Sequence, residues 1–162
     1  MTEVPSGSWD SPYLENFGHG VAREHGGGGE TDGGAVDVHA WYTTGLELLG
    51  KGSPAAAAQV LQRAADAEPS SRSVREALAR AQFDTGQYAA AADNFRVIVD
   101  ASPADDYAHF GLGLALARSG DHQSAAEYLA LAAAMRPDRK HYTDALRQVR
   151  ATLKARQAPP EP

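Results

Sequence analysis

The residues of this chain that could take part in chemistry are its histidines, its carboxylates and one stretch of glycine and lysine. Gly45, Gly50 and Lys51 approach the spacing of a phosphate-binding loop. Such a loop requires Ser or Thr directly after the lysine, on a turn from a strand into a helix. Gly52 follows the lysine here, so the stretch fits a helix end and a turn better than a nucleotide site.

The histidines and carboxylates show no arrangement typical of a metal or catalytic site. The six histidines lack metal-ligand spacing, and His109 is expected to be a semi-buried helix residue with a satisfied ring. Asp105 and Asp106 stand at a predicted helix start, where carboxylates interact favourably with the helix dipole. No nucleophile and base can be paired, and the chain has no cysteine. The sequence therefore predicts a protein that is not an enzyme, with no cofactor and no metal.

Length and charge narrow the class of protein further. The chain has 162 residues and a net charge of −6, which argues against nucleic acid as its main partner. No apolar run is long enough to cross a membrane, so no membrane association is expected. The N-terminus lacks a basic stretch followed by an apolar core, as in a secretory signal, so a cytoplasmic location is expected by default.

The elements that must position any site are organised by a period of 34 residues. Three prolines follow one another at this spacing, and small and large apolar residues recur in phase with them. The positions in the three units are Trp41, Thr44, Gly45, Leu48, Ala57, Leu61, Ala64 and Pro69; Leu78, Ala79, Ala91, Phe95, Ile98 and Pro103; and Leu112, Gly113, Leu116, Ala125, Leu129, Ala132 and Pro137. A period of this length indicates a helical repeat.

The pattern resembles the tetratricopeptide repeat (TPR), whose signature is W-x2-L-G-x2-Y, then A-x3-F, then P. The resemblance covers residues 38–139, as repeats 38–71, 72–105 and 106–139. Polar or smaller residues depart from it at Thr44, Arg75, Gln82 and His109. The resemblance implies an all-α fold, an α-solenoid of three helix hairpins.

Turn and capping signals predict where the helices lie. We expect helices over about 39–49, 54–67, 73–84, 87–100, 105–118 and 122–135. Gly52, Gly86 and Gly120 are 34 residues apart, where each hairpin needs a left-handed residue. Ser53 and Pro54 fit the N-cap and first position of a helix. Alanines at 57, 91 and 125 indicate close crossing of the two helices of each hairpin.

Residues 140–157 are predicted to form a capping helix over the last hairpin. Tyr142, Leu146, Val149 and Leu153 fall on one stripe of an amphipathic helix, and basic residues fill the outer face. A repeat stack needs such a cap because its last hairpin leaves an apolar face uncovered. Residues 158–162 are expected to fray.

Residues 1–37 read as a disordered tail. They are rich in glycine and carry seven acidic residues and one basic residue, Arg23. Such a segment buries too little apolar surface to offset the entropy lost on ordering. One apolar cluster interrupts them, formed by Trp9, Tyr13, Leu14 and Phe17. Ser11 and Pro12 are a plausible helix start, so residues 9–17 are expected to form a short aromatic motif.

The resemblance also implies a binding site. In this family, positions 2, 5, 9 and 12 of each repeat line a concave groove that receives peptides. These positions are His39, Tyr42, Leu46 and Leu49; Ser73, Glu76, Arg80 and Phe83; and Tyr107, Phe110, Leu114 and Ala117, with Arg118 following at the edge. The residues predicted to bind a peptide are Tyr42, Leu46, Leu49, Glu76, Arg80, Phe83, Tyr107, Phe110, Leu114 and Arg118. An aromatic and aliphatic groove with a few charges has the composition of a binding hot spot. The alternative is that these residues pack between neighbouring helices or are covered by the chain's own tail.

One family function is disfavoured by the residues at the groove positions. Chaperone-binding members hold a peptide's carboxylates with a clamp of lysine, asparagine and arginine. At the matching places this chain has Tyr42, Leu46, Ala77, Tyr107 and Gly111. The resemblance therefore does not imply binding of an acidic chaperone C-terminus.

The sequence favours a non-catalytic interaction module, an adaptor or regulatory subunit that binds a peptide or helix with apolar anchor residues. The alternative is a self-associating scaffold protein, a homo-oligomer whose groove takes its own or a neighbour's N-terminal tail. Intramolecular docking of residues 9–17 is a specific form of this hypothesis. A third reading, an accessory factor bound to an enzyme, needs no chemistry from this chain.

Overall fold

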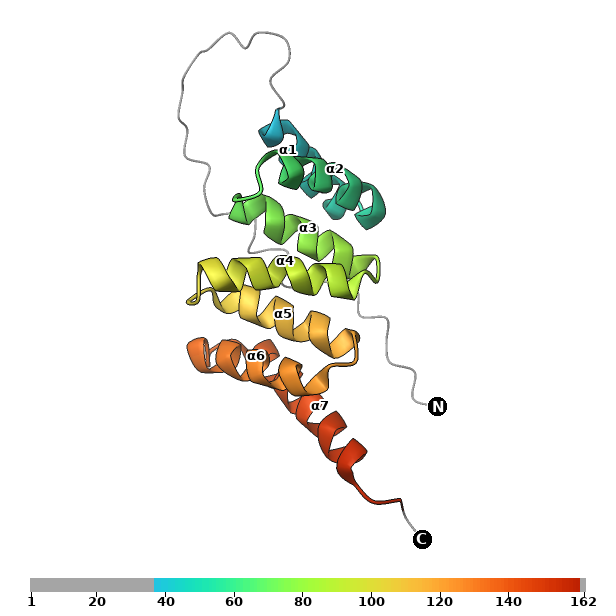
Figure 1. Cartoon of the computed structure of the whole chain (residues 1–162), viewed down its shortest axis with the longest axis vertical. Helices are drawn as coiled ribbons and strands as arrows, with labels where there is room; N and C mark the ends of the chain where they lie inside the picture. The colour runs from blue at the N-terminus through green and yellow to red at the C-terminus, as the bar shows by residue number, and fades with distance from the viewer. Residues whose placement is uncertain (1–36, 161–162) are drawn as a thin grey trace. The chain divides into compact units, whose positions relative to one another are not determined.

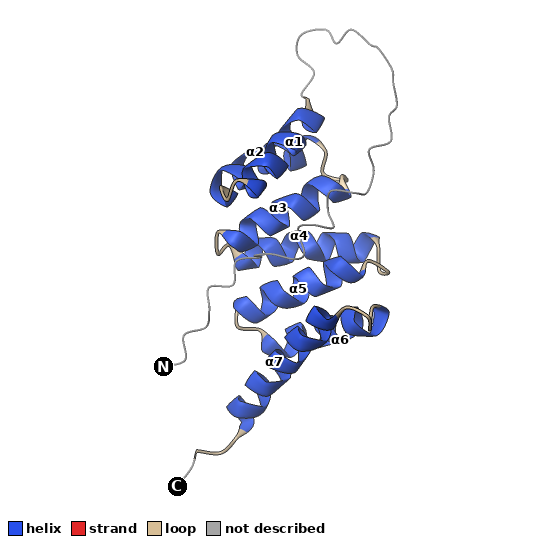
Figure 2. Ribbon diagram, turned by 180° about the vertical axis from the view of Figure 1, so that it is seen from behind, coloured by secondary structure: helices blue, strands red, loops and turns tan. Residues whose placement is uncertain are grey.

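The computed structural model describes residues 37–160, which form seven α-helices and no strand (Figures 1 and 2). The all-α fold expected from the period is therefore confirmed. Figure 1 shows the helices following one another in chain order through a stack. Their bounds are α1 Val38–Gly50, α2 Pro54–Ala67, α3 Arg72–Asp84, α4 Tyr88–Ala101, α5 Asp106–Arg118, α6 His122–Met135 and α7 Lys140–Gln157.

The helices begin where the sequence supplies a cap. Asp37, Asp105 and Asp121 each accept a hydrogen bond from a backbone N–H in the first turn of α1, α5 and α6. Such a bond satisfies one of the N–H groups that the first turn leaves unpaired. Ser53 precedes α2 without a side-chain capping bond, and Pro54 opens the helix. Asp37, assigned above to the tail, thus caps the first helix.

Each hairpin turns on a glycine in the left-handed region. Gly52, Gly86 and Gly120 have φ angles of 71°, 79° and 95°. The stretch that approached a phosphate-binding loop is accordingly the end of α1 and this turn, since Gly45 lies within the helix and Lys51 follows its last residue. It lacks the strand-to-helix context that phosphate binding requires.

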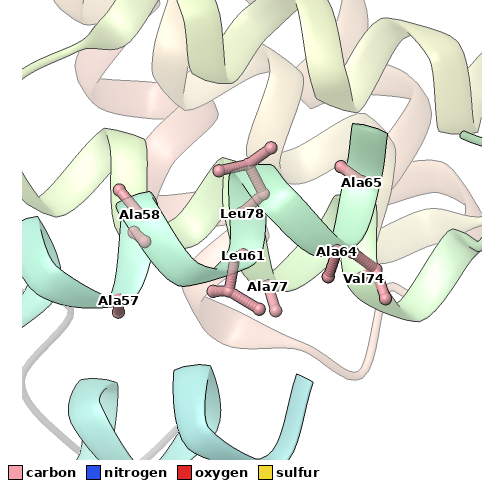
Figure 3. Packing of buried hydrophobic residues seen from close by; sticks show 9 residues of the cluster. Ala57, Ala58, Leu61, Ala64, Ala65, Val74, Ala77 and Leu78 are labelled. Atoms are coloured by element: carbon pink, nitrogen blue, oxygen red, sulfur yellow. The ribbon is translucent and has the colours of Figure 1, made fainter. Parts of the chain in front are cut away.

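Small residues let the two helices of a hairpin approach closely. Ala57, Ala91 and Ala125 are completely buried, as the 34-residue pattern predicted. An added Cβ on Gly45 would lie 2.4 Å from Leu61, and one on Gly113 would lie 2.6 Å from Leu129. Figure 3 shows Leu61 within the core cluster that α2 and α3 form.

Polar residues at two signature positions are paired with each other through α4. Arg75 stands at the tryptophan position and Gln82 at the tyrosine position of repeat two. Asn94 accepts a hydrogen bond from Arg75 (2.9 Å) and donates one to Gln82 (2.7 Å). One period later His109 lies beside Tyr128, with ring centroids 6.1 Å apart. The polar residues Arg75, Gln82 and His109, which depart from the family pattern, therefore each have a partner on the second helix of their own hairpin.

Ion pairs join the starts of successive first helices. Arg72, at the start of α3, donates to Asp105 before α5 through Nε at 2.6 Å. One period later the charges are exchanged, because Asp106 at the start of α5 lies 4.0 Å from Nε of Arg139 before α7. Two ion pairs thus link successive first helices at the same repeat positions, with the acidic and basic residues exchanged between them.

The last helix, α7, packs on α6 and α5. Tyr142 is completely buried and donates a hydrogen bond of 2.7 Å to Asp106, and its ring stacks on Phe110. Arg147 occupies the repeat position held by Gly45 and Gly113 in the earlier first helices, and its side chain is exposed. A long side chain there prevents a further helix from crossing α7 closely.

No helix between residues 37 and 160 is both long and apolar enough to span a membrane. The predictions for residues 1–36, including the aromatic motif at 9–17 and its docking, lie outside the described residues.

Candidate peptide-binding face

The first helices of the hairpins form the inner side of the stack. Successive first helices contact one another from α1 through α3 and α5 to α7, whereas α2, α4 and α6 make no such contacts. Helices that touch on one side and are apart on the other must curve toward the side where they touch. We call the residues of α1, α3 and α5 at the predicted groove positions the inner face; they are Tyr42, Leu46, Leu49, Glu76, Arg80, Phe83, Tyr107, Phe110, Leu114 and Arg118.

A charged pair lies at the centre of the inner face. Glu76 and Arg80 on α3 are only 7% and 6% exposed. Arg72 contacts Glu76 at 3.1 Å. Burial raises the pKa of Glu76, although Arg72 opposes the shift. Burial of a charge is unfavourable unless partners compensate for it, so this pair is an unusual feature of a helical surface.

Two tyrosines flank the charged pair from the neighbouring helices. Burial raises the pKa of Tyr42 on α1, and the charges of Glu76 and Arg80 act on the same hydroxyl. Burial also raises the pKa of Tyr107 on α5, where Arg80 lowers it and Glu76 raises it. The hydroxyls of Tyr42 and Tyr107, on either side of α3 in the stack, are therefore both within the electrostatic influence of Glu76 and Arg80.

A second cluster lies at the other end of the same helices. The rings of Phe83 and Tyr88 meet edge to face, with centroids 5.1 Å apart. The guanidinium of Arg118 lies 5.7 Å from the first ring centroid and 5.8 Å from the second. An exposed cation held over two rings can offer both a charge and a flat surface to a ligand.

The ten predicted groove residues are exposed to different degrees. Leu46 (37% exposed) and Arg118 reach solvent, while Tyr42, Leu49, Tyr107 and Leu114 are partly exposed. The other four, Glu76, Arg80, Phe83 and Phe110, are buried. Phe110 belongs to the interface of α5 with α7, because its ring lies 4.5 Å from Tyr142 and 5.2 Å from His141.

Sequence reasoning missed two residues that lie against the predicted ones. Tyr88 opens α4, so a search of the first helices could not find it. His141 follows Tyr107 by one period and holds the same repeat position on α7, so continuing the 34-residue count into the cap would have found it.

The side chains of the inner face are aromatic, aliphatic and charged. Aromatic and aliphatic surfaces can hold apolar side chains, and the exposed Arg118 can orient a main chain. Among residues 37–160, no group of three or more histidines and carboxylates is placed to hold a metal ion. His109 hydrogen-bonds the Asp105 carbonyl at 2.8 Å through Nδ1, which satisfies the ring as expected.

Stacked helix hairpins with one curved inner face define this protein as a helical-repeat solenoid. A family model described as tetratricopeptide repeat matches residues 42–106 and 77–140, more than half of the chain. The chain belongs to the tetratricopeptide repeat family. A search of curated proteins found no match.

Solved structures with the same fold are distant in sequence. A MamA double mutant is 22% identical with a TM-score of 0.69, and the match covers 72% of this chain but only 65% of that one, less than two thirds. The first TPR of Spaghetti (RPAP3), bound to the HSP90 peptide SRMEEVD, is 18% identical with a TM-score of 0.68, over 72% of this chain and 93% of that one. The first TPR domain of human RPAP3 is also 18% identical, with a TM-score of 0.67 over 73% and 93%. At these identities the likeness concerns the fold alone.

Proposed function

We propose that this protein is a non-catalytic interaction module, an adaptor or regulatory subunit that binds an apolar peptide or helix on its inner face. The observation that carries the proposal is that the first helices contact one another on the inner side of the stack. From this arrangement we infer that Tyr42, Leu46 and Leu114 share one concave surface, with the charges of Glu76 and Arg80 between them. A largely apolar concavity with a few convergent polar groups is the usual form of a binding site.

The proposed ligand differs from the HSP90 peptide of the RPAP3 structure. That peptide, SRMEEVD, is acidic at its C-terminus. The carboxylate-clamp positions suggested by the family resemblance hold Tyr42, Leu46, Ala77, Tyr107 and Gly111 in this chain. None of these side chains is a cation, so a ligand with aromatic or aliphatic anchors fits better than a terminal carboxylate.

The experiment is a peptide selection on the immobilised full chain, followed by affinity measurements with fluorescent peptides. Leu46→Glu and Leu114→Glu should each lower the affinity for the selected peptide tenfold or more, because an apolar anchor would then meet an unpaired charge. A tenfold loss of affinity corresponds to about 1.4 kcal/mol of binding free energy. The peptide SRMEEVD should show no saturable binding.

Matched controls lie on the outer helices. Val97 and Leu131 are one period apart on α4 and α6 and are 45% and 48% exposed. Val97→Glu and Leu131→Glu introduce the same charge away from the inner face, so they should leave the affinity unchanged. Equal losses in the inner and outer variants, with helicity retained, would contradict the proposal. Light scattering over a concentration series separates it from the self-associating scaffold.

A further inference from the structure

The chain that precedes α1 carries a segment with the chemistry proposed for the ligand. The described helices begin at Val38, capped by Asp37, and 36 residues precede this cap. Within those residues Trp9, Tyr13, Leu14 and Phe17 are the clustered large apolar side chains. If they form a helix, Tyr13 and Phe17 fall on one face, since residues four apart are neighbours there.

We propose that residues 9–17 dock on the inner face of their own molecule and compete with the partner for it. The proposal rests on the proposed function and adds to it a regulator supplied by the chain itself. Residues 9–17 would act as an internal ligand that a partner must displace.

The connecting chain is long enough for this. Residues 18–37 are 20 residues rich in glycine, and a flexible chain of this length spans about 25 Å on average. Neighbouring packed helices are separated by about 8–10 Å, so α5 lies about 20 Å from α1 along the stack. The tether ends at the N-cap of α1, which is itself one wall of the inner face. Docking therefore needs no stretching of the chain.

The charges of the segment and of the face are complementary. The segment 9–17 carries Asp10 and Glu15 and no basic residue. The inner face offers Arg118, held over the rings of Phe83 and Tyr88. Residues 136–157 hold seven basic and two acidic residues, a net charge of +5, whereas residues 1–36 hold six acidic residues and one basic residue, a net charge of −5. Electrostatic attraction of this kind favours encounter and fixes orientation.

Tethering makes even a weak contact effective. A short flexible linker gives an effective concentration in the millimolar range. A segment with an intrinsic dissociation constant of about 0.1 mM would then reduce the affinity for an external peptide about tenfold. Replacing the aromatic residues of the segment should therefore raise the affinity for an external peptide by the same factor of about ten.

The first test follows Trp9 in the full chain. Trp41→Phe leaves Trp9 as the single tryptophan, so its emission reports the segment. Docking predicts emission at shorter wavelength, and weaker acrylamide quenching, than in a free peptide of residues 8–18. Leu114→Glu in this background should move both values to those of the free peptide, whereas Val97→Glu should not. Values equal to those of the free peptide in the parent protein would overturn the proposal.

The second test measures affinity for the selected peptide. Trp9→Ser combined with Tyr13→Ser and Phe17→Ser should bind the peptide about tenfold more tightly than the wild type, by the tethering estimate above. Val4→Ser with Val21→Ser is the matched control, outside the cluster but in the same stretch, and should change nothing. Equal affinity in the triple variant, the control and the wild type would refute self-docking.

The outcomes also separate the two proposals. If the triple variant binds no selected peptide, the proposed function fails; if it binds one as the wild type does, only the self-docking fails. If the shielding of Trp9 increases with protein concentration and light scattering shows a dimer, the inner face is occupied by residues 9–17 of a second copy. That result would overturn the proposal of intramolecular docking.

Discussion

At the scale of single residues, the close approach of helices depends on glycine at three positions, Gly45, Gly111 and Gly113. Gly113→Ala should destabilise the fold by about 1–3 kcal/mol, because the new methyl group meets Leu129 in a well-packed hairpin. Gly50 is the control, since it lies at the end of α1 with nothing within 4 Å of an added Cβ. Gly50→Ala should be neutral or stabilising by less than about 1 kcal/mol. Urea unfolding measures the free energy of unfolding of both variants. Equal changes in this free energy would contradict the packing argument.

The buried carboxylate of Glu76 predicts a pH dependence of stability. Burial raises its pKa in the folded state, so the folded protein holds this proton more tightly than the unfolded chain does. Stability from this group is therefore complete below the unfolded pKa of about 4.3 and falls as the pH rises through the higher folded pKa. Glu76→Gln removes the titration, so its melting temperature relative to wild type should increase from about pH 4 to pH 7. Parallel melting curves, or a relative decrease, would contradict burial as the dominant effect over the opposing Arg72.

At the scale of elements, Tyr142 is the most deeply buried side chain of α7. Tyr142→Phe should cost about 1 kcal/mol, because it removes the hydrogen bond to Asp106 and keeps the ring that stacks on Phe110. Tyr142→Ala should cost about 3–5 kcal/mol, since it also empties a fully buried site. Chemical unfolding measures both. A loss for the alanine variant no larger than for the phenylalanine variant would mean that α7 does not cap the stack through this residue.

The helices could be predicted from the sequence because local signals and the period agree. Proline, glycine and the capping aspartates mark helix ends, and α6 spans the predicted residues His122–Met135. The alanines at the crossing points were found for the same reason, since their spacing repeats the geometry of the hairpin. A fold can be predicted from its sequence when the local helix-end signals agree with the long-range repeat pattern.

The inner face could be predicted only in part, because the burial of a side chain depends on its neighbours in space. The 34-residue period gives a residue's position in the repeat but not these neighbours. Phe110 has the position of a groove residue, yet it is buried against Tyr142 and His141 of α7. Phe110→Glu is consequently expected to destabilise the cap rather than only the binding of a partner. The pairing of Arg75 with Asn94 was likewise hidden, since it needs the contact between α3 and α4.

At the scale of the whole stack, protection should be graded from its first helix to its interior. One residue of α1 is buried, compared with eight of α5. In repeat proteins each unit is stabilised by its neighbours, and segments with few buried contacts open at low free energy. Hydrogen exchange of the full chain should therefore be faster in α1 than in α5 by mass spectrometry. Uniform exchange through both helices would indicate that the stack opens only as one unit.

Arg147 on α7 also decides where the chain could gain a further repeat. A new 34-residue unit inserted after Pro103 would find the same kinds of helix surface that α4 and α5 already present to each other. A unit added after α7 would have to lay its second helix across Arg147, where the hairpins that begin with α1 and α5 have Gly45 and Gly113. Duplication can thus lengthen this protein from within, while growth beyond α7 first requires that arginine to become small.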